Sequence, residues 1–542
     1  MNRRLTKIIC GILAMGFAFG FSACGGNKNE VDSSKTQLYI DHYAGGFGSE
    51  WINIAKKDFE EKYKDTEFEP GKKGVQVWVD DGKDGGNELI ERLNGKRGHI
   101  FITESMYYYD YLSKDLLLDI SDAVTEPLTD LGENKTIESK LVKSQQDFLS
   151  VDKKYYAVPH YFACNGITYD VELFDEYSLF LDEEGNFTKK HDEEGLSVGA
   201  DGIAGTYDDG LPATFDDFFR LCAEMSEYAT PLIWSGQYKF YVDYFLGALA
   251  AEINGKNNTE ISFTFNGKSD RVITGFDEKG VPLTEEVEIN ADNAYRVYEQ
   301  SGYYYALQFI KKIIENNYYA YQSFEEWNSN IETQNTYLLS NRDESLTPIA
   351  MLIEGNWWEN EAAGTFESMS EMYSKAGRMD RKFAFMPLPK PSADYLNENH
   401  TIVESNNSYM FIKKSVDDVH AEVAKKFIRF VNTDEKLREF TKLTNTPKAL
   451  EYTVDDSTLN AMSYFGKAVL NYKNSKTTDV IYQCSNNPRY YNNMSRFEMS
   501  RIYEHGELLH AATAFHDNSS LTLKNFYNGY IANWKTWFEN HK

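Results

Sequence analysis

The stretch LYIDHYAGGFGSEW, from Leu38 to Trp51, decides how the folded part of the chain begins. Its first residues, Leu38 to Ile40, predict a short buried strand, and three glycines between residues 45 and 48 allow a sharp turn. Ser49 is a suitable N-cap for a helix that begins near Glu50. A strand, a glycine-rich turn and a helix N-terminus is the arrangement in which open α/β domains present a ligand site.

The composition of this loop argues against a phosphate ligand. Its glycines do not fit G-x-G-x-x-G, and no Lys-Ser or Lys-Thr pair follows them. The loop instead carries three aromatic rings, on Tyr43, Phe47 and Trp51, which suit an uncharged ring-shaped ligand such as a sugar. The alternative is that these rings pack in the core of a lobe.

The first 23 residues have the organisation of a secretory signal peptide. Basic residues precede an apolar run from Ile8 to Phe21, and the run is too short for a comfortable membrane-spanning helix. Its end, Phe21-Ser-Ala-Cys24, resembles a bacterial lipobox, although Leu is usual at the position of Phe21. The resemblance implies lipid attachment to Cys24, a polar tether over residues 24–36, and a location on the extracellular face of the cell membrane. An ordinary secreted protein is the alternative.

The net charge limits the classes of possible partner, and the cysteine content limits the number of possible disulfides. The formal net charge of −28 argues against nucleic acid and against general adhesion to anionic membranes. Beyond the leader and Cys24, the chain has Cys164, Cys222 and Cys484. Because their number is odd and their spacing wide, we expect buried free thiols with at most one disulfide pair.

Strands and helices are expected to alternate after the opening stretch. Val75 to Val79 (VQVWV) and His99 to Thr103 (HIFIT) predict strands, with a helix over Leu89 to Leu93 between them. This order predicts an α/β fold with a parallel sheet. Farther along, Thr214 is a candidate N-cap of a helix, with two aspartates in the first turn.

Five segments of the chain resemble motifs of a known protein family. Each match is weak alone, but all five occur in the order found in that family, which makes the set specific. They are YAVPHYFACNGITYDVELF (Tyr156 to Phe174), PATFDDFF (Pro212 to Phe219), GNWW (Gly355 to Trp358), FMPLP (Phe385 to Pro389), and Val423 to Val431 with the turn at Asn432 to Glu435. Together they resemble the extracellular solute-binding proteins, family 1 type, of bacterial carbohydrate ABC importers. The stretch from about Ser457 to Lys542 matches no motif and reads as helical.

The resemblance implies a fold and its division into lobes. The expected fold is α/β and periplasmic-binding-protein-like, with two lobes joined by two or three crossover strands and the ligand in the cleft between them. Lobe one would comprise residues 37–158 and 386–433. Lobe two would comprise residues 159–385 and 434–542, with insertions.

A loop from Gly199 to Gly210, GADGIAGTYDDG, predicts a calcium site. Its carboxylates, Asp201, Asp208 and Asp209, are hard oxygen ligands, and its glycines let carbonyls turn inward. It lacks the EF-hand spacing but resembles loops of extracellular calcium-binding modules. A bound Ca²⁺ would be structural, and the alternative is an acidic, glycine-rich surface turn.

Sugar recognition needs flat rings and planar polar groups at strand ends and crossings. The candidate ligand-binding residues are Tyr43, Phe47, Trp51, Glu104, Asn165, Trp234, Gln237, Tyr238, Trp357, Glu404 and Asn406. Trp51 and Trp357 are the strongest of them. Of the pair Trp357 and Trp358, we expect one to face the cleft and the other the core.

Catalysis has little support, because no G-x-S-x-G, H-E-x-x-H or Walker A motif occurs. The main hypothesis is therefore a monomeric, lipid-anchored receptor that captures a neutral oligosaccharide and delivers it to the permease subunits of an ABC transporter. Two alternatives remain open: a surface glycoside hydrolase or lyase, and a surface interaction protein of the same fold.

Overall fold

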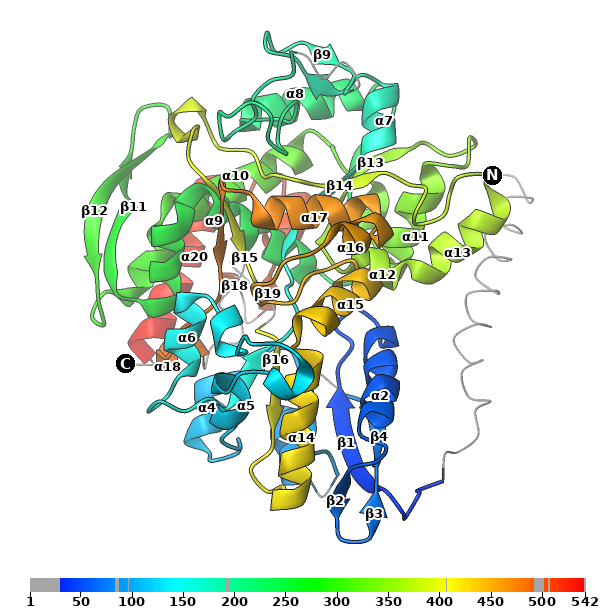
Figure 1. Ribbon diagram of the computed structural model, residues 1–542. Coiled ribbons are helices and arrows are strands. Elements are labelled where there is room, and N and C mark those ends of the chain that lie inside the picture. The colour runs from blue at the N-terminus through cyan, green and yellow to red at the C-terminus, as the bar shows by residue number, and fades with distance from the viewer. Residues whose placement is uncertain are drawn as a thin grey trace.

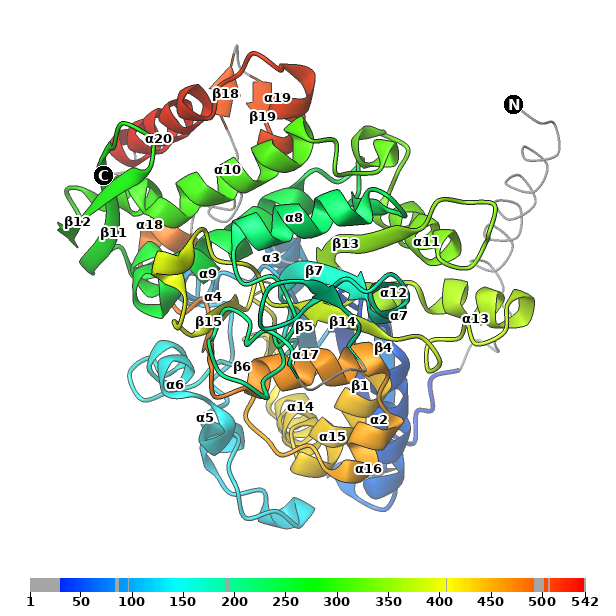
Figure 2. The same cartoon turned by 90° about the horizontal axis from the view of Figure 1, so that it is seen from above.

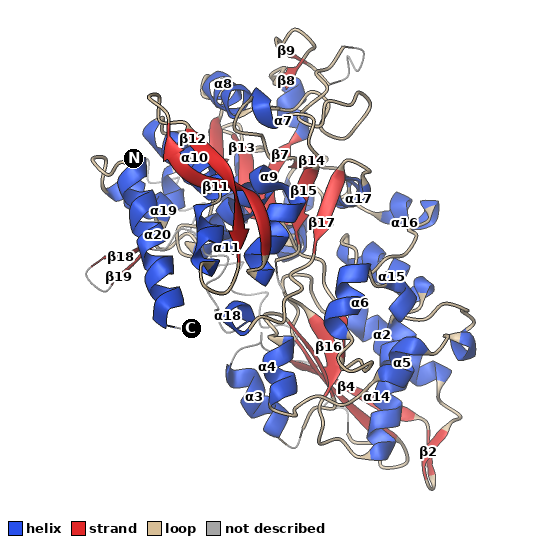
Figure 3. Ribbon diagram, turned by 90° about the vertical axis from the view of Figure 1, so that its left-hand side faces the viewer, coloured by secondary structure: helices blue, strands red, loops and turns tan. Residues whose placement is uncertain are grey.

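The computed structural model describes residues 30–82, 87–95, 97–190, 195–405, 407–491, 502–504 and 507–540. The predicted signal peptide, Cys24 and Asn406 lie outside the described residues. The described chain forms two α/β lobes, seen one above the other in Figure 3. Within this part of the chain, no helix combines the length and apolar character needed to cross a bilayer.

The sheet of the first lobe has five strands in the order β4-β1-β5-β16-β6. The opening stretch supplies β1, which runs parallel to both β4 and β5, while β16 is antiparallel to β5 and β6. The strands are β1 (Thr36–His42), β4 (Val75–Asp81), β5 (Ile100–Thr103), β6 (Ala157–Pro159) and β16 (Tyr409–Ile412). A small hairpin, β2 (Glu67–Glu69) with β3 (Lys72–Lys73), leads into β4.

Helices cover this sheet and close its core around Leu38 and Ile40, which are fully buried. The glycine-rich turn leads into α2 as expected, but the Ser49 hydroxyl makes no capping hydrogen bond, so Ser49 occupies the N-cap position only. The helices are α2 (Glu50–Lys62), α3 (Asn87–Asn94), α4 (Tyr108–Ser113), α5 (Ser121–Thr125), α6 (Lys143–Leu149), α14 (Asp418–Val431) and α15 (Asp434–Thr444).

The sheet of the second lobe is mixed, with the order β10-β13-β7-β14. β10 and β13 run parallel, so their carboxyl ends meet at one edge, and β7 is antiparallel to both β13 and β14. The strands are β7 (Asn165–Asp170), β10 (Thr230–Ile233), β13 (Ile349–Gly355) and β14 (Phe383–Met386). Two hairpins stand apart from this sheet: β8 (Phe180–Leu181) with β9 (Phe187–Thr188), and β11 (Gly267–Phe276) with β12 (Pro282–Ile289).

Long helices pack over the second sheet, and Figure 2 shows them beside one another. Thr214 caps its helix as predicted: its hydroxyl accepts from the Asp217 amide at 3.2 Å, and the Asp217 carboxylate accepts from the Thr214 amide. The helices up to β14 are α7 (Val171–Glu176), α8 (Phe215–Met225), α9 (Phe240–Thr264), α10 (Ser301–Glu315), α11 (Asn330–Ser340), α12 (Trp358–Glu361) and α13 (Ala363–Met372).

The C-terminal stretch was expected to be helical, and the structure adds strands to it. β17 pairs in parallel with β15 (His400–Val403), and β18 pairs with β19. The α19 helix packs on α10 (Figure 2). The α20 helix, red beside the C-terminus in Figure 1, packs on α10 and on the short helix over Ala294–Glu299. The elements are α16 (Asp456–Ala461), α17 (Tyr464–Asn474), β17 (Thr478–Ile481), α18 (Pro488–Tyr491), β18 (Ile502–Glu504), β19 (Glu507–Leu509), α19 (Ala511–Asp517) and α20 (Leu523–Asn540).

The structure draws the lobe boundaries differently from residues 386 and 434. Residues 386–403 stay with the second lobe, because Lys390 forms a buried ion pair with Glu252 of α9 and β15 pairs with β17. The chain returns to the first lobe only between Val403 and Tyr409. The α15 helix packs on α2 and adds Leu437 and Phe440 to the first core, so the first lobe extends to about residue 444.

Candidate functional site

The glycine-rich loop after β1 meets the second lobe directly. Gly46 has a φ of +78°, and a Cβ placed on it would lie 2.8 Å from Cδ1 of Trp357 and 3.1 Å from a carboxylate oxygen of Glu361. Gly45 has a φ of +57°, and a Cβ there would overlap the Glu104 carboxylate. Only glycine combines this backbone with such close approach. The loop therefore makes a direct contact between the lobes, which is the candidate ligand site.

Trp357 is the second-lobe partner in this contact. It follows β13 in the GNWW turn, is 7% exposed, and packs with the hydrophobic cluster of the first lobe rather than with that of its own. The Tyr241 ring lies 6.2 Å from it, centroid to centroid. Trp358 is fully buried and packs on Tyr337 and Phe383. One tryptophan thus faces the other lobe and its neighbour faces the core.

Carboxyl groups surround this aromatic pair. Burial raises the pKa of Glu354 well above its usual range, and the nearby charge of Glu361 raises it further. Burial also raises the pKa of Glu361, against the amide groups of Asn330 and Gln334, which donate to its carboxylate at 2.9 and 2.7 Å. Carboxyl oxygens beside side-chain amide groups are polar groups of the kind that suit hydroxyl groups.

The first lobe positions its side of the site through a buried hydrogen-bond chain. Tyr161 donates to the carbonyl of Tyr43 at 3.1 Å, and His42 Nε2 lies 2.8 Å from the Tyr161 oxygen. Burial lowers the pKa of His42 to about 3, so this imidazole is neutral near pH 7. The chain fixes the backbone at Tyr43, a half-buried side chain at the start of the loop.

Phe47 and Trp51 belong to the packing of the first lobe. Phe47 stacks on Tyr161 at 4.6 Å, and Trp51, which is 4% exposed, contacts His160 and Phe440. The structure thus follows the alternative interpretation of these two rings. Both rings are buried in the hydrophobic cluster of the first lobe.

Asn165, Glu404 and Ser405 lie at the crossings between the lobes. Asn165 donates to the Ser405 hydroxyl at 3.0 Å, and the Ser405 amide donates to the Ala163 carbonyl at 2.9 Å. The Glu404 amide donates to Ile481. The bonds of Asn165 and Ser405 tie the first crossing to the return crossing, and the bond of Glu404 ties the return crossing to β17. Glu104, 9% exposed, lies against Gly45 within the interlobe site.

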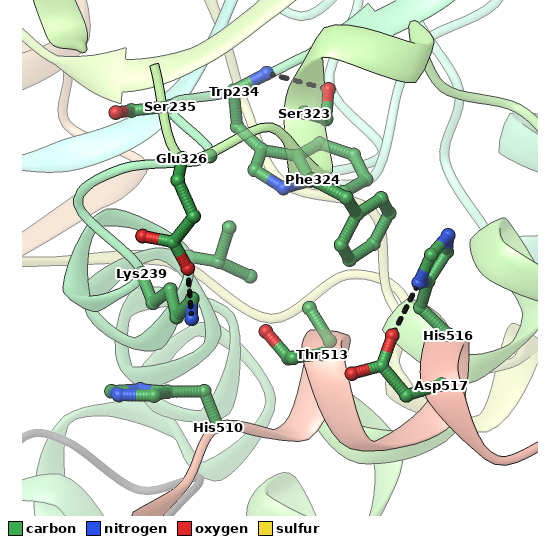
Figure 4. A pocket seen from close by; sticks show the side chains of 13 residues that line it. Trp234, Ser235, Lys239, Ser323, Phe324, Glu326, His510, Thr513, His516 and Asp517 are labelled. Atoms are coloured by element: carbon green, nitrogen blue, oxygen red, sulfur yellow. Dashed lines mark hydrogen bonds and ion pairs between the residues drawn. The ribbon is translucent and has the colours of Figure 1, made fainter. Parts of the chain in front are cut away.

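Trp234, Gln237 and Tyr238 follow β10, whose end lies beside that of β13. Trp234 is 2% exposed and lines a pocket of about 120 Å³ (Figure 4), while Gln237 and Tyr238 are exposed next to it. This pocket is separate from the interlobe contact.

Sequence reasoning missed Tyr241, Glu354 and Glu361. Tyr241 lies three residues after Tyr238, and Glu361 lies four residues after Trp357, one helical turn on. These spacings were the available signal.

The predicted calcium loop is held largely by its own backbone and by a histidine. Asp208 accepts from the amides of Ala200 and Asp201 at 2.7 and 3.1 Å, and from His400 at 3.1 Å. Asp209 accepts from the Gly205 amide at 2.6 Å. Among the described residues, no three His, Cys, Asp or Glu side chains converge as a metal-binding group. The second oxygen of Asp201 is buried without a hydrogen bond.

The three cysteines of the described chain are free thiols, as expected, and Cys164 and Cys222 are buried.

No protein-family model matches the chain, and no curated protein matches it either. Solved structures match over nearly its whole length. A chitin oligosaccharide binding protein is 13% identical with a TM-score of 0.56, and the match covers 93% of this chain and 100% of that protein. The apo form of RafE from Streptococcus pneumoniae is 13% identical with a TM-score of 0.56 and coverage of 94% and 99%. A sugar transporter protein from Bacillus licheniformis, solved with stachyose, is 14% identical with a TM-score of 0.51 and coverage of 93% and 99%.

These likenesses establish the fold. The chain has the two-lobed, periplasmic-binding-protein-like architecture of solute-binding proteins, with chain crossings between two α/β lobes.

Proposed function

We propose that this protein is the ligand-capturing receptor of an ABC importer and holds a neutral oligosaccharide between its lobes. The observation that carries the proposal is the meeting of the Gly45–Gly46 loop with Trp357 across the two lobes. The matched solved structures, which include a chitin oligosaccharide binding protein and a stachyose complex, support the same ligand class.

The chemistry of the site favours an uncharged, hydroxyl-rich ligand. The rings of Trp357 and Tyr241 offer apolar faces, while Glu104, Glu354 and Glu361 provide oxygen acceptors around them. Three carboxyl groups in one site oppose an anionic ligand such as a phosphate or a uronic acid. The net charge of −28 acts in the same direction.

Capture works through a difference between conformations. A ligand that contacts the Tyr43–Gly46 loop and Trp357 together stabilises only the arrangement in which the lobes meet. The receptor then presents this ligand-bound arrangement to separate permease subunits. Its place is the extracellular face of the membrane, where lipid on Cys24 anchors it, and Ca²⁺ in the Gly199–Gly210 loop stabilises the second lobe.

The proposal is tested by thermal shift and calorimetry of the protein against a panel of neutral oligosaccharides. A ligand that binds only the folded state raises the unfolding midpoint by mass action. We expect one sugar class to do so, Trp357→Ala to abolish the shift, and Trp78→Ala, the same change in β4 away from the site, to preserve it. If no oligosaccharide shifts the midpoint of a well-folded sample, the receptor proposal fails. Cleavage of a bound glycan would instead identify an enzyme.

A further inference from the structure

Two loops of the second lobe are tied into one surface beside the interlobe site. The first runs from Trp234 to Phe240, and the second runs from Tyr321 to Asn328. Ser235 donates to the Asn328 carbonyl at 2.9 Å, and the Gln237 amide donates to the same carbonyl at 3.1 Å. A Cβ on Gly236 would lie 2.5 Å from the Glu325 carbonyl oxygen, so the backbones touch here.

The α19 helix closes a pocket of about 120 Å³ against these loops. Figure 4 shows Trp234 and Phe324 on one side of it, with Thr513 of α19 facing them. The two aromatic rings meet edge to face at 5.5 Å. All lining residues belong to the second lobe, so the pocket is distinct from the contact between Gly46 and Trp357.

The polar side chains at this pocket lie beside one another in pairs. Lys239 pairs with Glu326 at 2.9 Å, and His516 lies 2.7 Å from Asp517. His510 lies 2.6 Å from the buried Asp243 behind the wall. Paired groups of this kind keep hydrogen-bonding capacity, which suits a neutral ligand rich in hydroxyls.

A row of rings connects the pocket rim with the interlobe site. Tyr238 and Phe240, 38% and 37% exposed, lie 5.7 Å apart. Phe240 stacks on Tyr241 at 5.0 Å, and Tyr241 lies 6.2 Å from Trp357. Trp327 adds a further exposed ring, 54% accessible, on the second loop. Exposed rings such as Tyr238 and Phe240, continuous with the buried pair Tyr241 and Trp357, are typical of a binding surface.

We propose that these loops and α19 form an outer sugar subsite, so that the ligand is an oligosaccharide of several units rather than a mono- or disaccharide. One end of the glycan lies at Trp357, its middle follows Tyr241, Phe240 and Tyr238, and a terminal neutral sugar unit enters the pocket beside Trp234. This inference rests on the proposed receptor function and specifies its substrate class.

The test measures affinity against glycan length by calorimetry with the mature chain. The probes are maltose to maltohexaose, chitobiose to chitohexaose, and the pair raffinose and stachyose. In the series that binds, we expect affinity to rise with length. Thr513→Trp, which fills the pocket, and Tyr238→Ala should each lower the affinity for the longest glycan by at least about fivefold. This is the loss expected when one important contact is removed. The shortest glycan should bind both variants with the same affinity as it binds the unaltered chain.

Tyr228→Ala is the matched control, because Tyr228 is 40% exposed and lies beyond the end of α8, stacked on Tyr177. It should leave the whole length series unchanged. The outer subsite would be overturned if the longest glycan bound Tyr238→Ala and a folded Thr513→Trp as tightly as it binds the unaltered chain. The proposed receptor function would stand in that case. Failure of every probe to bind the unaltered chain would overturn both.

Discussion

A methyl group at residue 46 tests the contact between the lobes, and Gly48 provides its control. Gly46 and Gly48 have nearly equal φ angles, +78° and +79°, so Ala carries the same backbone strain at either position. That strain amounts to about 1–2 kcal/mol. Nothing lies within 4 Å of a Cβ on Gly48, whereas a Cβ on Gly46 lies 2.8 Å from the Trp357 ring.

The difference between the two variants isolates the interlobe contact. Carbon atoms prefer a separation of about 3.5–4.0 Å, so the Trp357 indole must move by about 1 Å in Gly46→Ala. Overpacking of this kind costs about 1–3 kcal/mol beyond the backbone strain. We therefore expect Gly48→Ala to lose about 1–2 kcal/mol of unfolding free energy. For Gly46→Ala the expected loss is about 2–5 kcal/mol.

The two variants should differ more clearly in their affinity for the ligand than in their free energy of unfolding. Because the displaced indole belongs to the proposed ligand surface, Gly46→Ala should weaken binding of the tightest oligosaccharide in the panel by about tenfold or more. Gly48→Ala should bind like the unaltered chain. Urea denaturation gives the stabilities, and isothermal calorimetry gives the affinities. Equal affinities and equal stabilities for the two variants would refute the argument that Gly46 and Trp357 meet across the site.

Three further predictions concern other parts of the chain. Burial alone would lower the pKa of His400, but the carboxylates of Glu252 and Asp208 raise it to about 9. Its stabilising contribution is therefore complete below about pH 6.5 and is lost as pH rises through about 9, by at most about 3 kcal/mol. The stability of the unaltered chain relative to His400→Gln, measured by urea denaturation, should fall over this range, and a constant difference would contradict it. Ca²⁺ should raise the unfolding midpoint and chelator should lower it, whereas Asp201→Asn should respond to neither; an unchanged midpoint in the unaltered chain would remove calcium from the proposal. Mass spectrometry should find a mature chain that begins at a lipid-modified Cys24, and Cys24→Ser should release the protein from membranes; another first residue would rule the anchor out.

Local sequence was sufficient wherever local interactions decide the structure. Thr214 and Asp217 cap one another across three residues, so the start of α8 could be predicted from spacing alone. The opening strand, turn and helix were predictable for the same reason, since each depends on its own few residues. The ordered motifs extended this to the fold, and the matched solved structures agree with it.

Long-range packing decided what the sequence left open. Trp51 and Trp357 both follow strands that lead to the same site, yet Trp51 is enclosed by His160 and Phe440, which lie far along the chain. The carboxylate of Asp208 also contacts His400, 192 residues away, a partner that the sequence of the loop could not reveal. The lobe to which α15 belongs could not be predicted from the sequence of α15 itself, because the packing of α15 on α2 of the first lobe decides it.

The C-terminal stretch shows why ligand length could not be predicted from the motifs. Those motifs end before Ser457, and they describe the two lobes and their crossings. The pocket beside Trp234 needs α19, which comes from beyond them and packs on α10. The motif-bearing part of the chain therefore builds the interlobe site around Trp357, while the stretch without motifs completes a second wall next to it. If the outer subsite holds sugar, selectivity for longer glycans depends on the part of the chain that carries no recognised motif.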